Sequence, residues 1–309
     1  MICKPLSTLL GKRVHYSLPM ALSLTLLLPA CSSSPLDEIE GQEQQSVCEV
    51  TITIGGLDVT TAPITRATAA DAKVTHITLT AFDASGAEAF SLTQTTADAD
   101  FGTLTTKVPV GEYTFVAVAH KLPEGAPAAT IASLTQASVT GYTDLLTFSC
   151  VQAVSVSGNG SQSITLDMGR RKNAVLTLNI TDPTPAEVEA LQMIVSPTAT
   201  ALPDVVTYDP STGNATSTWR YERTITKDNG IFTGTTYGLP ILLADTEQQL
   251  DVTFNALDAQ GNVLYTRTKA GHLFQQAAYT KVSGTFFSSA TSGAFDFDTS
   301  ITNIPVSLD

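Results

Sequence analysis

Short runs of alternating apolar and polar residues, separated by turn-forming residues, extend along most of the chain. Residues 50–54 and 76–82 alternate with period two, which predicts half-buried strands because successive strand side chains point to opposite faces. Residues 113–119 are apolar on both faces, as expected for a strand that is covered on both sides. The stretches that complete a predicted seven-stranded unit are 87–92, 145–148, 153–156 and 163–166.

The same pattern begins again at residue 174 and predicts a second group of strands. Residues 185–195 are the best helical stretch, but their helical spacing of apolar residues is short and their end fits a strand equally well. Residues 123–140 are rich in Pro, Ala and Thr and predict a long loop with room for one short helix. The further predicted strands are 174–180, 191–195, 205–208, 217–226, 231–237, 250–257, 263–268, 279–287 and 301–308.

We therefore predict an all-β fold built from two β-sandwich domains in tandem. Many short strands divided by turn residues are typical of sandwiches, and the chain is long enough for two of them. The expected N-terminal sandwich is 48–169, the linker is 170–173 and the C-terminal sandwich is 174–309.

The first thirty residues have the three parts of an export signal. Three basic residues precede an apolar run at 18–28, which is shorter than the roughly 20 residues that a membrane-spanning helix needs. The segment closes on Leu28-Pro29-Ala30-Cys31, which resembles a lipobox, so 1–30 is predicted to be a lipoprotein signal peptide. Cys31 would then carry the lipid at the mature N-terminus. The alternative is an ordinary signal peptide that contains a cysteine.

Residues 31–47 are expected to form a flexible tether. They are rich in serine, glutamine and acidic residues and show no hydrophobic periodicity, so they cannot bury enough apolar surface to fold. A lipid, a tether and a folded domain follow one another in the order expected of an anchored protein.

The predicted mature chain is strongly acidic. The full chain has 16 Lys+Arg and 29 Asp+Glu, and three of the basic residues lie in 1–30, which leaves 13 against 29 and a formal charge of -16. Only Arg170-Arg171-Lys172 forms a basic cluster, so the sequence gives no electrostatic basis for binding nucleic acid.

Two cysteines remain once the signal peptide is cleaved and Cys31 carries a lipid. Cys48 and Cys150 lie in strand-like sequence near the start and the end of the first predicted domain. Two thiols in an oxidising compartment favour a disulfide, and we predict that these two pair. Two buried, unpaired thiols are the alternative.

Residues with metal-binding chemistry are scattered. His76, His120 and His272 have no neighbours at ligand spacing, so we expect no metal site. His76 falls on the polar face of its strand, where a solvated histidine is expected.

Residues with catalytic or sugar-binding chemistry are equally few. Asp296 and Asp298 alternate around Phe297, which predicts a solvated strand face more than a glycosidase pair. Trp219 is the only tryptophan, which argues against a stacked-aromatic sugar-binding surface. We expect no enzymatic activity, no small-molecule substrate and no cofactor apart from a covalent diacylglyceryl or acyl lipid on Cys31.

Four stretches together carry a resemblance to a known family. They are Pro63-Ile64-Thr65-Arg66-Ala67, the hairpin at 77–90 with 108–113, the junction at 171–182 and the late stretch 279–287. With these, the chain resembles the fimbrillin-like subunits of Bacteroidales type V pili, and above all their fimbrial anchor subunits. The resemblance implies two transthyretin-like (Ig-like) sandwiches, export to the outer membrane as a lipoprotein, and assembly with fimbrial subunits by donor-strand exchange.

The resemblance also implies a processing site. In stalk subunits of the family, an arginine-specific protease removes the first strand together with the lipid. Arg66 is the only arginine between Cys31 and Arg170, so a cut between Arg66 and Ala67 would separate the first strand from the rest of the chain. An uncut surface arginine is the alternative.

A pair of Cys48 with Cys150 would tie the first strand to its domain and would favour an anchor that keeps its lipid. The expected donor or docking element is the C-terminal stretch that contains Ile301, Ile304, Val306 and Leu308, with a last strand of the second sandwich as an equal alternative. A protease-processed stalk or tip subunit and a glycan-binding surface lipoprotein are the other functions considered.

Overall fold

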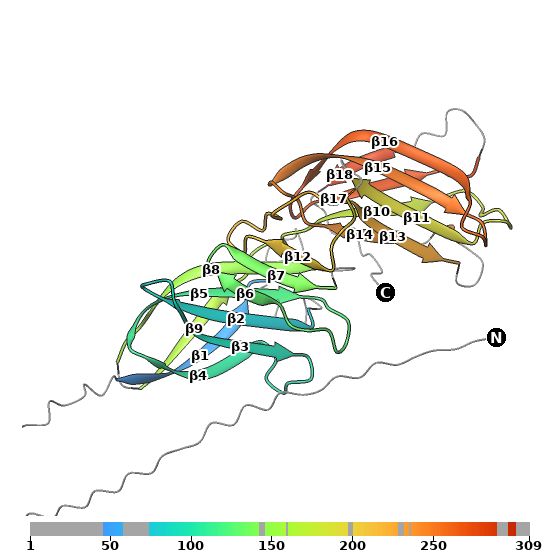
Figure 1. Ribbon diagram of the computed structural model, residues 1–309. Coiled ribbons are helices and arrows are strands. Elements are labelled where there is room, and N and C mark those ends of the chain that lie inside the picture. Colours follow the sequence, from blue (N-terminus) through green and yellow to red (C-terminus); the bar gives the residue numbers. More distant parts are fainter. Residues whose placement is uncertain are drawn as a thin grey trace, which may run out of the picture. The chain divides into compact units, whose positions relative to one another are not determined.

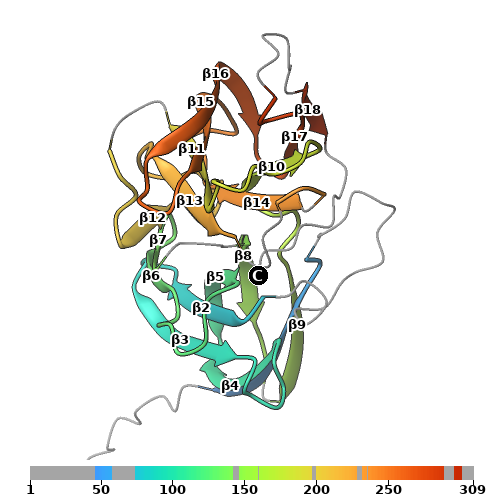
Figure 2. The same ribbon diagram turned by 90° about the vertical axis from the view of Figure 1, so that its right-hand side faces the viewer.

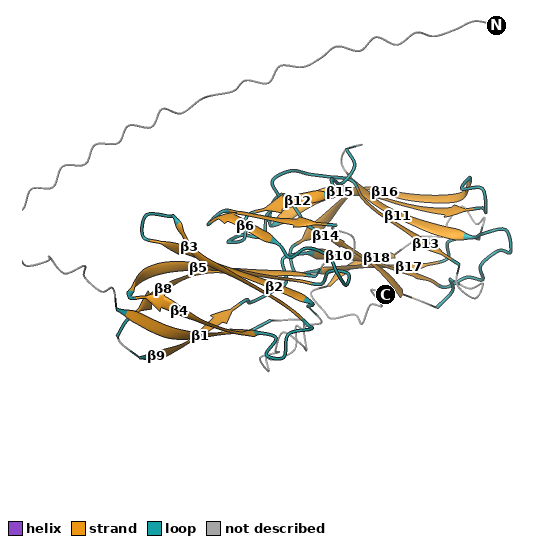
Figure 3. Ribbon diagram, turned by 60° about the horizontal axis from the view of Figure 1, so that its bottom comes forward, coloured by secondary structure: helices purple, strands orange, loops and turns teal. Residues whose placement is uncertain are grey.

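The structure is a computed structural model that describes residues 46–57, 74–141, 146–158, 160–196, 200–227, 232–234, 236–288 and, for the backbone, 296–300. Within these ranges every regular element is a strand (Figure 3), so the all-β prediction is confirmed. No helix in this part of the chain is long and apolar enough to span a membrane. The predictions for Cys31, for Arg66 and Ala67, and for 301–308 fall outside the described residues.

Two sheets pack against each other in the N-terminal part (Figure 1). Apolar residues of both sheets, such as Ile52 and Phe115, fill one core cluster. In the three-stranded sheet, of order β4-β1-β9, the strands are β1 (Val47–Gly55), β4 (Thr103–Pro109) and β9 (Ser161–Asp167). In the four-stranded sheet, of order β3-β2-β5-β8, they are β2 (His76–Asp83), β3 (Glu88–Thr95), β5 (Gly111–His120) and β8 (Thr147–Val156).

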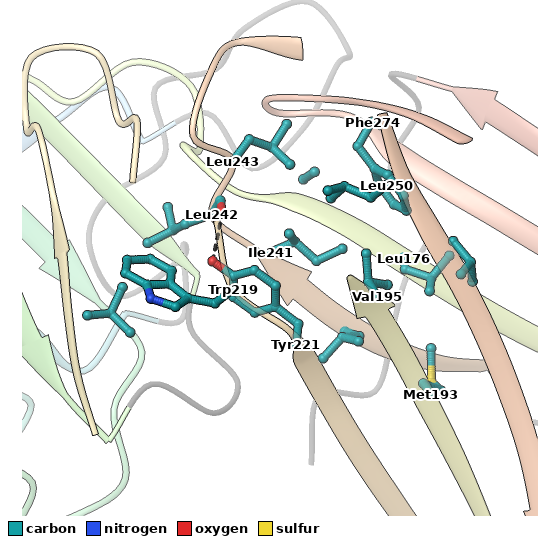
Figure 4. Packing of buried hydrophobic residues seen from close by; sticks show 14 of the residues in the cluster. Leu176, Met193, Val195, Trp219, Tyr221, Ile241, Leu242, Leu243, Leu250 and Phe274 are labelled. Carbon is teal, nitrogen blue, oxygen red and sulfur yellow. Dashed lines mark hydrogen bonds between the residues drawn. The ribbon is translucent and has the colours of Figure 1, made fainter. Parts of the chain in front are cut away.

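A second pair of sheets forms from residue 174 onward. Its core contains Leu176, Val195, Leu250 and Phe274 (Figure 4). The sheet of order β14-β10-β17-β18 consists of β10 (Ala174–Ile180), β14 (Thr236–Ile241), β17 (Tyr279–Gly284) and β18 (Asp296–Ser300). The sheet of order β13-β11-β15-β16 consists of β11 (Ala190–Ser196), β13 (Tyr221–Thr226), β15 (Glu247–Leu257) and β16 (Val263–Gln275).

A small third sheet takes strands from both parts of the chain. Its order is β12-β7-β6, with β6 (Thr130–Ser133), β7 (Gln136–Thr140) and β12 (Val205–Tyr208), and β12 lies beside β7 in Figure 2. Ile131 and Val139 of this sheet share a core cluster with residues from beyond 174. One core cluster thus contains residues from both sides of the expected linker at 170–173. The predicted domain boundaries therefore stay a prediction.

Several predicted strands differ from the observed ones. The loop expected at 123–140 contains β6 and β7, because Ile131, Ala137 and Val139 find a buried surface that the local sequence does not reveal. β4 was not predicted, since only Leu104 and Val108 in it are buried. The stretches at 145–148 and 153–156 belong to one strand, β8, and the helical stretch at 185–195 contributes to β11. The strand expected at 231–237 begins later, as β14.

Candidate functional site

β1 is the strand on which the predicted function depends, and it lies in the middle of its sheet. It pairs antiparallel with β4 and parallel with β9, so both of its edges carry backbone hydrogen bonds. Its four inward side chains, Cys48, Val50, Ile52 and Ile54, are at most 2% exposed. If β1 were absent, β4 and β9 would stand about 9.5 Å apart, which is the space of one strand.

The bonds at the two ends of β1 fix its register. The Glu49 N–H donates to the Gly160 carbonyl at 2.8 Å, and the Ile54 N–H donates to the Gly102 carbonyl at 2.8 Å. Gly56, which follows the strand, has a φ of 67°, and a Cβ there would lie 1.9 Å from Oδ1 of Asp167. A side chain at position 56 would be strained and would have to displace the Asp167 carboxylate, so glycine is favoured where the chain leaves β1.

The predicted disulfide is not formed, and both Cys48 and Cys150 are free thiols in this structure. Cys48 lies opposite Val108, near the point where β4 passes into β5, whereas Cys150 lies opposite Ala117, six residues beyond Gly111. Six residues of strand correspond to about 20 Å, while a disulfide requires Cα atoms within about 7 Å. Burial raises the pKa of the Cys150 thiol to about 11. The register of the two sheets therefore keeps these cysteines apart.

His76 is not solvated as predicted but only 5% exposed, because both faces of β2 are covered. The segment before β6 lies over the outer face, where Thr78 Oγ1 donates to the Ala129 carbonyl at 3.0 Å. His76 is paired across the sheet with His120, whose Nε2 lies 2.9 Å from the Tyr208 hydroxyl oxygen. Complete burial, and then the neighbouring His76, lower the pKa of His120 to about 3.

The basic tripeptide at 170–172 is only partly exposed, because Arg170 faces solvent whereas Arg171 is buried and Lys172 is half-buried. Arg171 is 5% exposed, donates to the carbonyls of Asn173 and Ala277, and lies over the ring of Tyr279. Burial lowers the pKa of Lys172. One sequence feature indicates this role, since the basic run lies at a junction between two apolar strands.

The remaining residues singled out in the sequence do not come together as a site. Trp219 is 7% exposed within the core (Figure 4), so it offers no sugar-stacking face. Asp296 and Asp298 lie on β18, of which the backbone alone is described. Among the described residues, no group of three or more His, Cys, Asp or Glu could hold a metal ion.

One shallow pocket of about 230 Å³ lies beside the start of β13. Ala201, Leu202, Arg220 and Glu222 line it. The Arg220 guanidinium donates to the Glu222 carboxylate at 2.6 Å, so the two charges neutralise each other. Among the described residues that line it, the pocket therefore has neither a net charge nor an aromatic ring with which to bind a ligand strongly.

Solved structures of fimbrial proteins are similar to this chain at low sequence identity. The fimbrial anchor protein Mfa2 from Porphyromonas gingivalis is 11% identical, and the match covers 81% of this chain and 95% of that one with a TM-score of 0.46. The tip fimbrial protein Mfa3 from the same organism is 11% identical over 84% of this chain and 100% of that one, with a TM-score of 0.45. No curated protein matches the sequence.

The family model of the fimbrillin-A associated anchor proteins Mfa1 and Mfa2 matches residues 45–282. This match begins just before β1, includes the junction at 170–173 and ends in β17. Because it covers well over half of the chain, the protein belongs to the family of fimbrillin-A associated anchor proteins.

Proposed function

We propose that this protein is a non-catalytic fimbrial anchor, a surface lipoprotein that keeps its own first strand and its lipid. The observation that supports this proposal is the position of β1, bonded along both edges and packed through four buried side chains. Loss of β1 would break its hydrogen bonds to β4 and β9 and would expose the core that its side chains fill. Full burial of one valine or isoleucine side chain stabilises a protein by about 1.5–3 kcal/mol, so this loss would be costly. A sandwich that is complete in itself needs no strand from a neighbour.

The lipid and β1 are retained or lost together. Cys31 precedes Val47 by 16 residues, a distance that an extended tether spans with about 50 Å of reach. A chain with lipid on Cys31 and an intact β1 would therefore hold its folded part close to the outer membrane, at the cell surface. A cut between Arg66 and Ala67 would remove the covalent link, and no disulfide from Cys48 would replace it.

We further propose that the chain joins fimbrial subunits by strand addition, with 301–308 as the donor or docking segment. An extended segment can complete the sheet of a neighbour through backbone hydrogen bonds, with alternate side chains filling pockets. Ile301, Ile304, Val306 and Leu308 supply apolar side chains for such pockets. The alternative is that this segment completes the sheet β14-β10-β17-β18 within the same chain.

Capture of a fimbrillin tests this role. The mature chain and a variant that ends at Ser300 are each mixed with a purified fimbrillin and a panel of neutral glycans. We expect the mature chain to retain the fimbrillin and the shortened variant to retain much less, with both variants equally folded by circular dichroism. Retention of glycan without fimbrillin would support the glycan-binding alternative, and equal fimbrillin capture by both variants would contradict the role of 301–308.

A further inference from the structure

The chain that connects the two sandwiches is held at both of its ends by buried hydrogen bonds. On the side of the first sandwich, the Lys172 N–H donates to the Thr147 carbonyl at 2.7 Å. The Thr147 N–H in turn donates to Oδ1 of Asn173 at 2.6 Å, and Asn173 is completely buried. These two bonds continue the edge of β8 into the connection.

Arg171 fixes the same connection to the second sandwich. Its Nε donates to the Asn173 carbonyl at 3.0 Å and its guanidinium donates to the Ala277 carbonyl at 2.9 Å. Ala277 has a φ of 61°, a conformation rare for alanine, and its N–H donates to the Asn173 carbonyl at 3.0 Å. Arg171 and Asn173 thus bridge the connection to the turn that precedes β17.

A second set of contacts joins the two parts away from the connection. All four residues of β12 pair with β7, and the Gly141 N–H extends this ladder by donating to the Asp204 carbonyl at 2.9 Å. The Tyr208 hydroxyl lies 2.9 Å from Nε2 of His120, with both side chains buried. Ser149 Oγ donates to the Pro210 carbonyl at 2.6 Å. The contacts therefore come from separate stretches of sequence, around 140, 149 and 208.

We infer that these contacts make the two sandwiches one cooperative and rigid body, with Asn173 and Tyr208 as its coupling residues. Domains that share only a flexible linker move and unfold separately, whereas a shared sheet, a shared core and buried polar bonds oppose separate opening. For the anchor proposed above, and resting on that proposal, tension on a fibre would pass through this joint without extending a linker. The cooperativity itself does not depend on that role.

Hydrogen exchange measured by mass spectrometry at increasing urea concentration tests the inference. The full mature chain, with Cys31→Ser to prevent lipidation, is followed through peptides from β5 and from β15, which are central strands of the two sandwiches. We expect both peptides to lose protection at the same urea concentration. In the double variant Asn173→Ala and Tyr208→Phe, we expect the two transitions to separate.

Tyr221→Phe is the matched control, because the Tyr221 hydroxyl donates to the Leu242 carbonyl within the second sandwich (Figure 4). It also removes one buried tyrosine hydroxyl, but it should shift both transitions together. Separate transitions in the unaltered chain would overturn the inference, and so would coincident transitions in the double variant. Neither outcome involves a membrane or a fimbrial subunit, so the proposed function is tested independently.

Discussion

At the residue scale, His120 shows how burial gives a side chain its chemistry. Completely enclosed beside Tyr208 and opposite His76, it has a pKa of about 3, so it is neutral in the folded protein at neutral pH. The same side chain in the unfolded chain would have a pKa near 6.5. Protonation of His120 is therefore coupled to unfolding.

This coupling gives a pH dependence with a definite sign. Between pH 6.5 and pH 3 the unfolded chain binds the proton that folded His120 excludes, so stability falls as the pH falls, by up to about 1.4 kcal/mol per pH unit. Urea unfolding at pH 7 and pH 5 should show a loss of about 2 kcal/mol beyond that of a His120→Phe variant. Equal pH dependence in the two chains would contradict the burial of a neutral histidine.

The two cysteines provide a second test at this scale. After denaturation without reductant, a chain that starts at residue 31 and carries Cys31→Ser should react with maleimide at two positions, Cys48 and Cys150. Before denaturation both should react slowly, because Cys48 is buried and the pKa of Cys150 is about 11. Labelling that requires prior reduction would show that the predicted disulfide exists and that the register argument is wrong.

At the scale of elements, β1 combines a clear sequence pattern with a central position. Ile52 is fully buried, and Ile52→Ala should lower the free energy of unfolding by about 2–5 kcal/mol through lost contacts and a cavity. Thr53→Ala, at an exposed position on the outward face of the same strand, should change it by less than about 0.5 kcal/mol. Chemical denaturation of both variants measures the difference, and similar effects would mean that β1 does not face the core.

The accuracy of the sequence predictions depends on what covers each strand. The strands β1, β5 and β10 were predicted because the apolar residues within each of them indicate which positions are buried. β6, β7 and the burial of His76 were missed, because their cover comes from residues distant in sequence. Thr78 and Thr80 look solvent-facing in sequence, yet both are buried, with hydroxyls bonded to Ala129 and Ser91. Polar residues on one face of a predicted strand therefore indicate solvent exposure only if no other segment packs against that face.

Long-range contacts also decide where the candidate site residues lie. Arg171 and Lys172 stood out as a basic cluster, but the contacts that bury them involve Ala277 and Gly213, more than forty residues away. The spacing of Cys48 and Cys150 allowed a disulfide, and only strand register shows that the two lie at different points along the sandwich. Pairing partners across sheets are not contained in local sequence.

At the scale of the whole molecule, membership of an anchor-protein family points to the anchor role, and the central position of β1 shows what a cut at Arg66 would remove. The match to the anchor-protein family runs from just before β1 into β17, and the first pair of sheets contains β1 as a central strand. A lipid on Cys31 would anchor the folded chain only if β1 stayed attached, because Cys31 lies on the N-terminal side of β1. The central claim is therefore that the chain on the cell surface begins at Cys31.

Intact mass spectrometry of protein extracted from the cell surface tests this claim most directly. We expect a chain that begins at Cys31, carries a diacylglyceryl or acyl lipid, and is continuous past Arg66. An Arg66→Ala variant is the matched control, and it should give the same product apart from the substitution. A lipid-free product that begins at Ala67 in the natural chain, absent from the variant, would contradict the anchor assignment and identify a processed stalk or tip subunit.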